Sequence, residues 1–208
     1  VIKRAPKGAG PRHVFLHNYD RRLWEQVLER LPHKHVARIS IVSPFFEPNH
    51  AQPDDPDVEP ADAGVFEHMF RDLTFEPPPG TKPVTVYFQE DGGKTLLPVD
   101  LLRTWEKQIE LRARLTTSDD PRPLHAKLLV IEGARSARRE PYLAVVHGSP
   151  NFTSAAFLSR PPDGNAEIAV LTHLHCKRNS HAQVGAALQL DGLFGEVRDW
   201  NLLRHDAP

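Results

Sequence analysis

The chain has 208 residues, with 26 Lys and Arg against 27 Asp and Glu, so its formal net charge is −1. This balance excludes a strong overall field that would draw the protein to DNA or to an anionic membrane, so a polyanion would have to meet a local patch. A single cysteine, Cys176, excludes an intramolecular disulfide framework and a cysteine-rich zinc module.

No apolar run approaches the roughly 18–20 residues that a membrane helix needs. The chain begins Val1-Ile2-Lys3-Arg4, without an initiator Met or the apolar segment of a signal peptide. We therefore expect a segment of a longer, cytoplasmic protein that has no membrane partner.

The N-terminal residues predict a linker, a helix and a strand. Residues 1–12 are basic and rich in Gly and Pro, which predicts a linker or arm ahead of a single domain over 13–208. Apolar residues at helical spacing predict a helix over about 20–31, with Asp20 as a candidate N-cap. The β-branched and apolar run 36–42 predicts a buried strand.

The middle of the chain alternates Pro-rich segments with regular structure. Residues 48–63 are acidic and rich in Pro, which indicates a loop. We expect a short helix over about 62–73, a strand over 84–88, a turn at Gly92-Gly93 and a helix over about 98–110.

The second half is denser in expected strands. Apolar runs predict strands over 124–132, 142–147 and 166–172, with a short helix over 152–158 and a last helix over about 181–196. Because strands alternate with helices along one pattern, the fold class is α/β in a single domain.

Three short polar segments stand out at the ends of these expected strands. They are His125-Ala126-Lys127, Gly148-Ser149-Pro150-Asn151 and Asn165-Ala166-Glu167. Residues two apart on a strand point to the same face, so His125 and Lys127 should project together. If the strands are neighbours, an imidazole, an ammonium, a hydroxyl and an amide converge.

This combination of side chains suits a phosphodiester. Lys127 would supply a positive charge for a nonbridging oxygen, and Ser149 and Asn151 would supply hydrogen bonds to the same group. A histidine can attack phosphorus or protonate a leaving oxygen. Glu167 could accept a hydrogen bond from the other ring nitrogen of His125 and stabilise its imidazolium form.

The strings HAKLLVIE, GSPNFTSAAF and NAEIAVL, in this order, resemble the phospholipase D superfamily, in which an H-x-K-x4-D motif is followed by G-S-x-N. The resemblance covers roughly 13–200. It implies an endonuclease-type α/β domain with a mixed β-sheet flanked by helices, and metal-independent phosphoryl transfer through a phosphohistidine without a cofactor.

By position in these motifs, the resemblance implies a role for each residue. His125 matches the nucleophile or acid histidine, and Glu167 matches the carboxylate that orients it. The phosphate-binding positions are Lys127, Ser149 and Asn151, and Gly148 supports them.

The sequence departs from the family pattern in two respects. Glu132 stands at the family aspartate, where a supporting role is implied, and the insert that follows carries Arg135, Arg138 and Arg139. These arginines could grip a nucleic-acid backbone, although a solvated hairpin tip is the simpler interpretation. Family active sites also contain two such motifs, so the second would come from the rest of the same protein or from a homodimer partner.

Several residues also have purely structural interpretations. Asn151 could cap the helix that follows it, Glu167 could be a surface carboxylate, and Phe45 and Phe46 could be core residues rather than stacking platforms. The group His173, His175 and Cys176 resembles metal ligands, but lacks an evident further ligand, so we expect no metal.

The function expected from the sequence is a nuclease of the phosphodiesterase class, with nucleic acid as its partner. Hydrolysis of phospholipid by the same chemistry is the first alternative, and the absence of an amphipathic basic helix disfavours it. A non-catalytic half of a two-motif protein is the second alternative, which the intact set from His125 to Glu167 disfavours.

Overall fold

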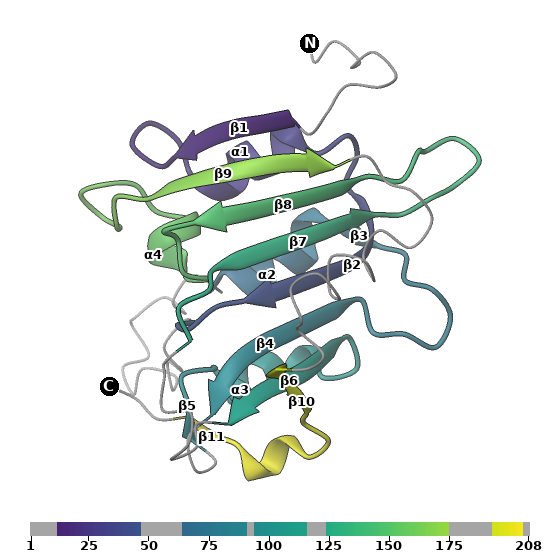
Figure 1. The fold of residues 1–208 in the computed structure, drawn as a ribbon, viewed down its shortest axis with the longest axis vertical. Coiled ribbons are helices and arrows are strands. Elements are labelled where there is room, and N and C mark those ends of the chain that lie inside the picture. The colour runs from purple at the N-terminus through teal and green to yellow at the C-terminus, as the bar shows by residue number, and fades with distance from the viewer. Residues whose placement is uncertain (1–11, 47–63, 91–93, 116–123, 175–192, 206–208) are drawn as a thin grey trace, which may run out of the picture.

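A computed structural model describes residues 12–46, 64–90, 94–115, 124–174 and 193–205 (Figure 1). Several expected elements lie outside the described residues. They are the linker apart from Arg12, the loop 48–63, the turn at Gly92-Gly93 and most of the helix over 181–196.

Nine strands form one mixed sheet, in the order β1-β9-β8-β7-β2-β4-β6-β10 with β3 beside β2, as the expected fold class requires. Neighbours from β1 to β2 along this order are antiparallel, β2, β4 and β6 are parallel, and β10 is antiparallel to β6. The strands are β1 Arg12–His17, β2 His35–Val42, β3 Thr74–Phe75, β4 Val84–Glu90, β6 Ile109–Leu115, β7 Leu128–Gly133, β8 Leu143–Gly148, β9 Ile168–Leu174 and β10 Gly195–Glu196. Short strands β5 Lys94–Thr95 and β11 Arg204–His205 pair separately.

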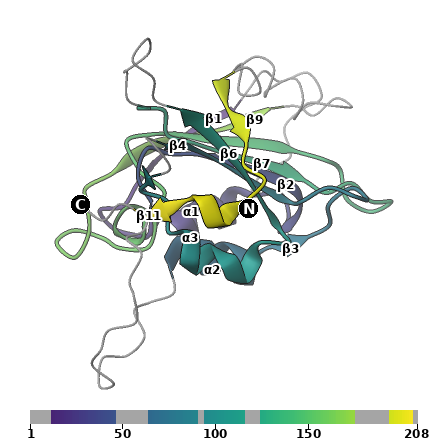
Figure 2. The same ribbon diagram turned by 90° about the horizontal axis from the view of Figure 1, so that it is seen from below.

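The helices are short, and α1, α2 and α3 lie on the same side of the sheet (Figure 2). They are α1 Leu23–Arg30, α2 Gly64–Asp72, α3 Val99–Leu102 and α4 Ser154–Phe157, with 3-10 turns at Arg103–Trp105 and Trp200–Leu202. One row of alternating strand residues, including Leu129, Ile41 and Val86, is buried together with the apolar positions of α1 and α2. This core holds the strand ends in place.

A polar contact joins the two longest helices within this core. Trp24 of α1 is 2% exposed, and its Nε1 donates a hydrogen bond of 2.9 Å to Oδ2 of Asp72 in α2. A buried indole N–H needs such an acceptor, so the contact fixes one helix against the other.

Three of the expectations about helices are wrong. The helix expected over 98–110 ends after α3 and its 3-10 turn, and Ile109–Leu115 forms β6 between β4 and β10. Its apolar residues alternate with Glu110, Arg112 and Arg114, which is the period of a strand. The N-cap position of α1 is Arg22 rather than Asp20. At the end of the helix expected over about 181–196, Gly195–Glu196 forms the short strand β10.

A cluster of charged side chains ties together the start of β2, the end of β3 and the β7–β8 hairpin. His35 Nδ1 lies 2.8 Å from Oε1 of Glu76, and Nη2 of Arg139 donates to both carboxylate oxygens of Glu76, at 2.9 and 2.7 Å. The hydrogen bond with His35 and the charge of Arg139 hold the pKa of the Glu76 carboxyl below its ordinary value.

This cluster predicts an acid-dependent contribution to stability. A carboxyl whose pKa is lowered in the folded state stabilises the protein above its unfolded pKa, about 4.3, and loses that effect as the pH falls through the folded value. We expect Glu76→Gln to lower the urea midpoint at pH 6, with a difference from wild type that shrinks by pH 3. Glu140→Gln on the same hairpin is the control, and parallel curves for wild type and Glu76→Gln at both pH values would contradict the prediction.

Candidate active site at one end of the sheet

The strand register brings the three polar segments of the sequence to the same end of the sheet. Leu128 at the start of β7 pairs with His147 near the end of β8, and Gly148 pairs with Ala169 near the start of β9. Because these strands are antiparallel neighbours, the residues before β7, after β8 and before β9 emerge together. Val42, the last residue of β2, also pairs with Leu128.

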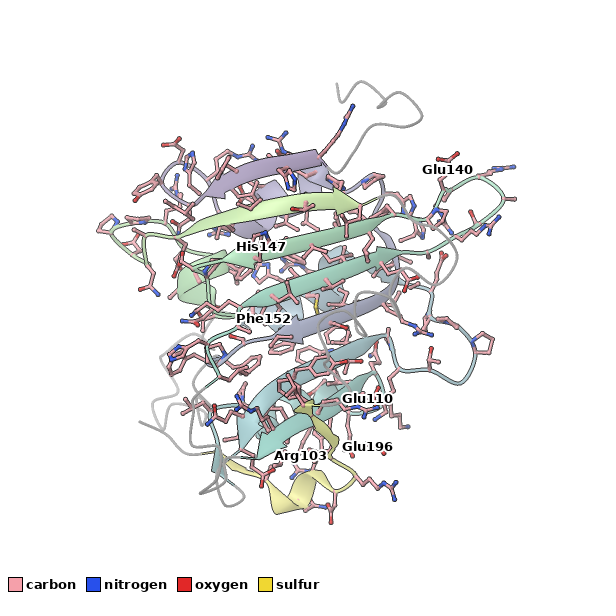
Figure 3. All side chains as sticks on the ribbon, in the orientation of Figure 1. Arg103, Glu110, Glu140, His147, Phe152 and Glu196 are labelled. Carbon is pink, nitrogen blue, oxygen red and sulfur yellow. The ribbon has the colours of Figure 1, made fainter. Side chains whose placement is uncertain are left out.

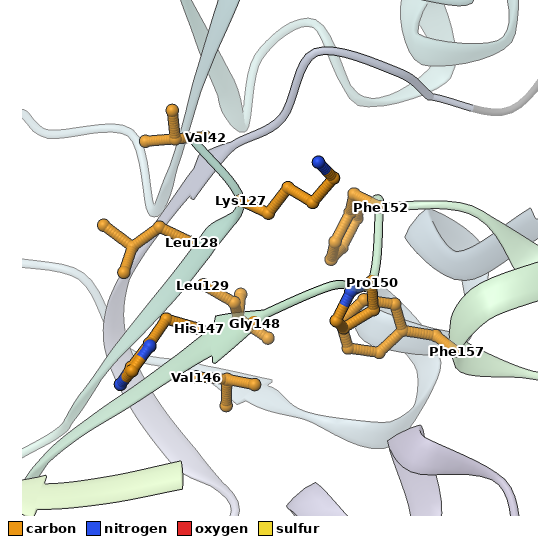
Figure 4. Close-up of a pocket in the computed structure, with 10 residues that line it drawn as sticks. All are labelled: Val42, Lys127, Leu128, Leu129, Val146, His147, Gly148, Pro150, Phe152 and Phe157. Carbon is orange, nitrogen blue, oxygen red and sulfur yellow. The ribbon is translucent and has the colours of Figure 1, made fainter. Parts of the chain in front are cut away.

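Lys127 lies half-buried in a small pocket between these strand ends. Gly148, Pro150, Phe152 and Phe157 also line the pocket, and Figure 4 shows the Lys127 side chain running toward Phe152. An ammonium group on an aromatic and aliphatic wall is less screened than one in open solvent, so its attraction for an anion is stronger.

His125 is exposed and precedes β7, which begins only at Leu128. The expected strand over 124–132 is therefore too long at its N-terminal end, and strand alternation does not determine how His125 and Lys127 project. Among the described residues, no side chain makes a hydrogen bond with the His125 ring. Its ring nitrogens are available to a substrate.

Gly148 allows the close approach of β8 to β9 at this end. Its φ is +154°, and an added Cβ would lie 2.5 Å from the carbonyl oxygen of Ile168 and 2.8 Å from Cα of Ala169. Both contacts are with backbone atoms, which a side-chain rotation cannot relieve. A residue with a side chain at this position would push Ser149 away from β9.

Gly148→Ala should therefore weaken both the fold and the site. The clash with Ile168 and Ala169 and the positive φ are expected to lower the free energy of unfolding by about 1–3 kcal/mol. Urea denaturation measures this change. Gly80→Ala is the control, because Gly80 also has a positive φ but an added Cβ there would meet no atom within 4 Å. A Gly148→Ala loss no greater than that of Gly80→Ala would disprove the steric account.

Ser149 and Glu167 contact each other directly. The Ser149 hydroxyl donates to Oε2 of Glu167 and accepts a hydrogen bond of 3.0 Å from the Ile168 N–H. Glu167 is 5% exposed, and the carboxylate makes no hydrogen bond with His125 among the described residues. In this structure the carboxylate orients Ser149.

A buried asparagine that the sequence analysis did not single out fixes the backbone of Glu167. Asn18 follows β1 and is 0% exposed, and its Oδ1 accepts a hydrogen bond of 2.8 Å from the Glu167 N–H. The Asn18 N–H donates to the Glu167 carbonyl at 3.3 Å. An isolated polar residue between a strand and a helix carries no motif, so no sequence signal marked it.

Asn151 is half-buried beside the pocket, and its Oδ1 is buried without a hydrogen-bond partner among the described residues. It does not cap α4, because the side chain of Thr153 takes that position and accepts from the Ala156 N–H. The neighbouring Phe152 N–H donates to the hydroxyl of Ser43 at 3.2 Å, which ties this turn to the end of β2. Asn151 thus keeps hydrogen-bonding capacity for another group.

The structure does not bring the other predicted residues to this end of the sheet. Glu132 lies at the far end of β7, where burial raises the pKa of its carboxyl and Arg38 partly opposes the effect. Arg135 and Arg138 are exposed on the β7–β8 hairpin, and Arg139 binds Glu76. Figure 3 shows Glu140 of this hairpin and Phe152 at opposite ends of the sheet.

The remaining candidates have structural surroundings. Phe46 is 6% exposed in the core, as the core interpretation predicts, whereas Phe45 is 48% exposed. His173 is half-buried on β9, and burial and the charge of Arg12 lower its pKa; His175 and Cys176 lie outside the described residues. Within the described ranges, no three His, Cys, Asp or Glu side chains form a candidate metal site. No helix among the described residues is long and apolar enough to cross a membrane.

Solved structures resemble this chain, although a scan of protein-family models and a search of curated proteins each found no match. A phospholipase D family member, Nuc from Salmonella typhimurium, has a TM-score of 0.52 and 15% identity, over 91% of this chain and 99% of that chain. Yeast tyrosyl-DNA phosphodiesterase has a TM-score of 0.43 and 13% identity, covering 77% of this chain and 32% of that chain. Polyphosphate kinase from Porphyromonas gingivalis has a TM-score of 0.43 and 13% identity, covering 87% of this chain and 26% of that chain.

The likeness to Nuc extends over nearly the whole of both chains, and the large mixed sheet with few helices agrees with the architecture expected from the motifs. This chain therefore has the phospholipase D fold.

Proposed function

We propose that this chain carries half of the active centre of a phosphodiesterase, with His125 as the nucleophile. The observation that supports the proposal most strongly is the register of β7, β8 and β9, which gathers Lys127, Ser149 and Asn151 at one end of the sheet. One cation and two neutral hydrogen-bonding groups match the charge and the oxygens of a phosphodiester.

In the proposed reaction, a ring nitrogen of His125 attacks phosphorus and forms a P–N bond, while the P–O bond to the leaving group breaks. The leaving oxygen takes a proton from an acid, and water then cleaves the P–N bond and releases a phosphomonoester. Lys127 balances the negative charge on the nonbridging oxygens throughout. The Ser149 hydroxyl, whose only proton Glu167 accepts in this structure, turns that proton to a nonbridging oxygen, and Asn151 donates through Nδ2. Together they hold the phosphate in line with the imidazole.

We assign the acid to a second histidine of the same kind, from a homodimer partner or from another part of the protein. A nucleophile and an acid on opposite sides of phosphorus suit an in-line displacement. In a two-fold dimer the same residue would stand on both sides of one cleft. Activity per chain should then rise with protein concentration if the second histidine comes from another copy.

The proposed chemistry needs no metal, because Lys127 supplies the electrophile and His125 the nucleophile. Hydrolysis of bis(4-nitrophenyl) phosphate by the assembled protein is expected to continue unchanged in excess EDTA. The rate is measured by 4-nitrophenolate release, with a magnesium-dependent nuclease as the positive control for chelation. Complete loss of activity that Mg²⁺ restores would rule out the proposed mechanism.

We propose nucleic acid as the substrate. Arg135 and Arg138 are exposed at the other end of the sheet, about 20 Å from Lys127 by the rise of β7. A polynucleotide can place one phosphate at Lys127 and others along this length, whereas a single lipid headgroup cannot. Cleavage of single- and double-stranded oligonucleotides should therefore weaken steeply as salt rises from about 50 to 200 mM, through counterion release. Cleavage of phosphatidylcholine vesicles but of no oligonucleotide would contradict this choice of substrate.

A further inference from the structure

The side chain of Asn18 makes three hydrogen bonds with backbone groups beside the candidate site. Its Nδ2 donates to the Asn165 carbonyl at 2.5 Å and to the Ser159 carbonyl at 3.4 Å, while Oδ1 accepts from the Glu167 N–H at 2.8 Å. The side chain is completely buried, so both ends of the amide are paired and its orientation is determined.

These contacts extend the pairing of β1 with β9 beyond its last strand residues. The pairing ends at His17 and Ile168, and the backbone bond from the Asn18 N–H to the Glu167 carbonyl continues it by one residue. Asn18 takes over both backbone groups of Glu167, accepting from its N–H through Oδ1 and donating to its carbonyl through its own N–H. Both backbone polar groups of Glu167 are therefore paired, as those of a residue inside the sheet are.

The fixed backbone determines where the Glu167 carboxylate lies. With the backbone held, the carboxylate accepts from the Ser149 hydroxyl, and the same hydroxyl accepts from the Ile168 N–H at 3.0 Å. A continuous series of hydrogen bonds thus leads from Asn18 through Glu167 to Ser149, the proposed phosphate ligand. The Ser149 hydroxyl has one proton, so a bound phosphate takes that proton over from Glu167, while the Ile168 N–H, next to the fixed Glu167 backbone, keeps Oγ in place. A residue such as Asn18 can change a site without touching the substrate, by orienting the groups that do.

We propose that Asn18 is a positioning residue of the phosphate site, acting through Glu167 on Ser149. This inference rests on the proposed function. Only an amide fits the position, because it must present an acceptor to the Glu167 N–H and a donor to two carbonyl oxygens. Aspartate would set an oxygen against the Asn165 carbonyl and add a negative charge beside Glu167.

The test is a double-mutant cycle between Asn18→Ala and Glu167→Gln, with bis(4-nitrophenyl) phosphate as the probe. We expect Asn18→Ala to lower kcat/KM about 10- to 100-fold, the range seen when a supporting hydrogen bond is removed at other sites. The double variant should be no worse than Glu167→Gln alone, within about twofold, because both changes release the same Ser149 hydroxyl. A loss from Asn18→Ala that multiplies with that of Glu167→Gln would overturn the proposal, as would no loss at all.

Thr172→Val is the matched control. Its hydroxyl lies 2.9 Å from Nδ1 of His13 and joins the same two strands, β1 and β9, at the end far from the site. We expect this variant to keep kcat/KM within about twofold of wild type, and any small loss to multiply with that of Glu167→Gln. A drop equal to that of Asn18→Ala would show that any weakening of the β1–β9 pair is enough, and would refute a specific role for Asn18.

A second readout separates this inference from the proposed function. Hydrogen exchange of the Glu167 and Ile168 amides reports their bonds to Asn18 and Ser149 without any substrate. Asn18→Ala, or the similarly sized Asn18→Leu if alanine prevents folding, should speed exchange of both amides more than tenfold. If only the Glu167 amide responds, the series of hydrogen bonds is not coupled and the inference fails. If both respond but wild type cleaves no phosphodiester, the proposed function fails while the coupling stands.

Discussion

His125→Ala is expected to lower phosphodiester hydrolysis by at least about 10⁴-fold, as the removal of a covalent nucleophile does in other enzymes. The ring is exposed and has no hydrogen bond within the described residues, so its loss should leave the fold intact. Wild-type protein quenched without acid should carry a phosphoramidate that is acid-labile and base-stable. Labelled substrate and peptide mapping would locate it on His125, and His125→Ala should carry none.

His13→Ala is the control for this experiment, because His13 is an exposed histidine on β1 that pairs with Thr172, away from the candidate site. Its turnover and adduct should match those of wild type. A label on a residue other than His125 would remove the assignment of the nucleophile. Undiminished turnover of His125→Ala in the assembled protein would do the same.

Trp24→Ala is expected to lower the free energy of unfolding by about 3–5 kcal/mol, the usual cost of removing a large aromatic side chain from a core. Trp24 is 2% exposed and joins α1 to Asp72 of α2. Trp24→Phe keeps most of the apolar contact and loses only the hydrogen bond, so its cost should be about 1–3 kcal/mol.

Urea denaturation at pH 7 measures both variants of Trp24. The exposed Tyr19, 55% accessible on the same segment, supplies the control Tyr19→Ala, which should cost less than about 1 kcal/mol. Equal losses for Trp24→Ala and Trp24→Phe would show that the apolar contact contributes little. A loss of under about 1 kcal/mol for Trp24→Ala would contradict the described core.

The convergence of the three polar segments could be predicted because each adjoins a run of apolar residues that reads as a strand. Periodicity marks the buried strands β2, β7, β8 and β9 clearly. The residues of β6 also alternate between apolar and charged, but they follow directly on α3 and its 3-10 turn. The helical spacing of that preceding segment hides the residue at which the strand begins.

The contacts inside the candidate site were harder to predict. The sequence favoured Glu167 as the partner of His125, whereas the carboxylate binds Ser149 in the structure. Ser149 directly follows β8 and Glu167 directly precedes β9, and these two strands are paired at that end. Asn18 lies almost 150 positions from Glu167 in the sequence, and their contact depends on β1 pairing with β9. Such a contact requires the tertiary topology, which no local pattern contains.

Because β7 and β8 are antiparallel, the geometry at their open end does not depend on the length of the hairpin that connects them. The spacing of Lys127 and Ser149 depends on the register, in which Leu128 faces His147, and not on the number of residues between Gly133 and Tyr142. An affinity tag inserted at the exposed tip from Arg135 to Arg138 should therefore leave the strand-end pocket and its hydrolysis of a small phosphodiester unchanged. The same insertion would disturb the proposed contact of these arginines with nucleic acid.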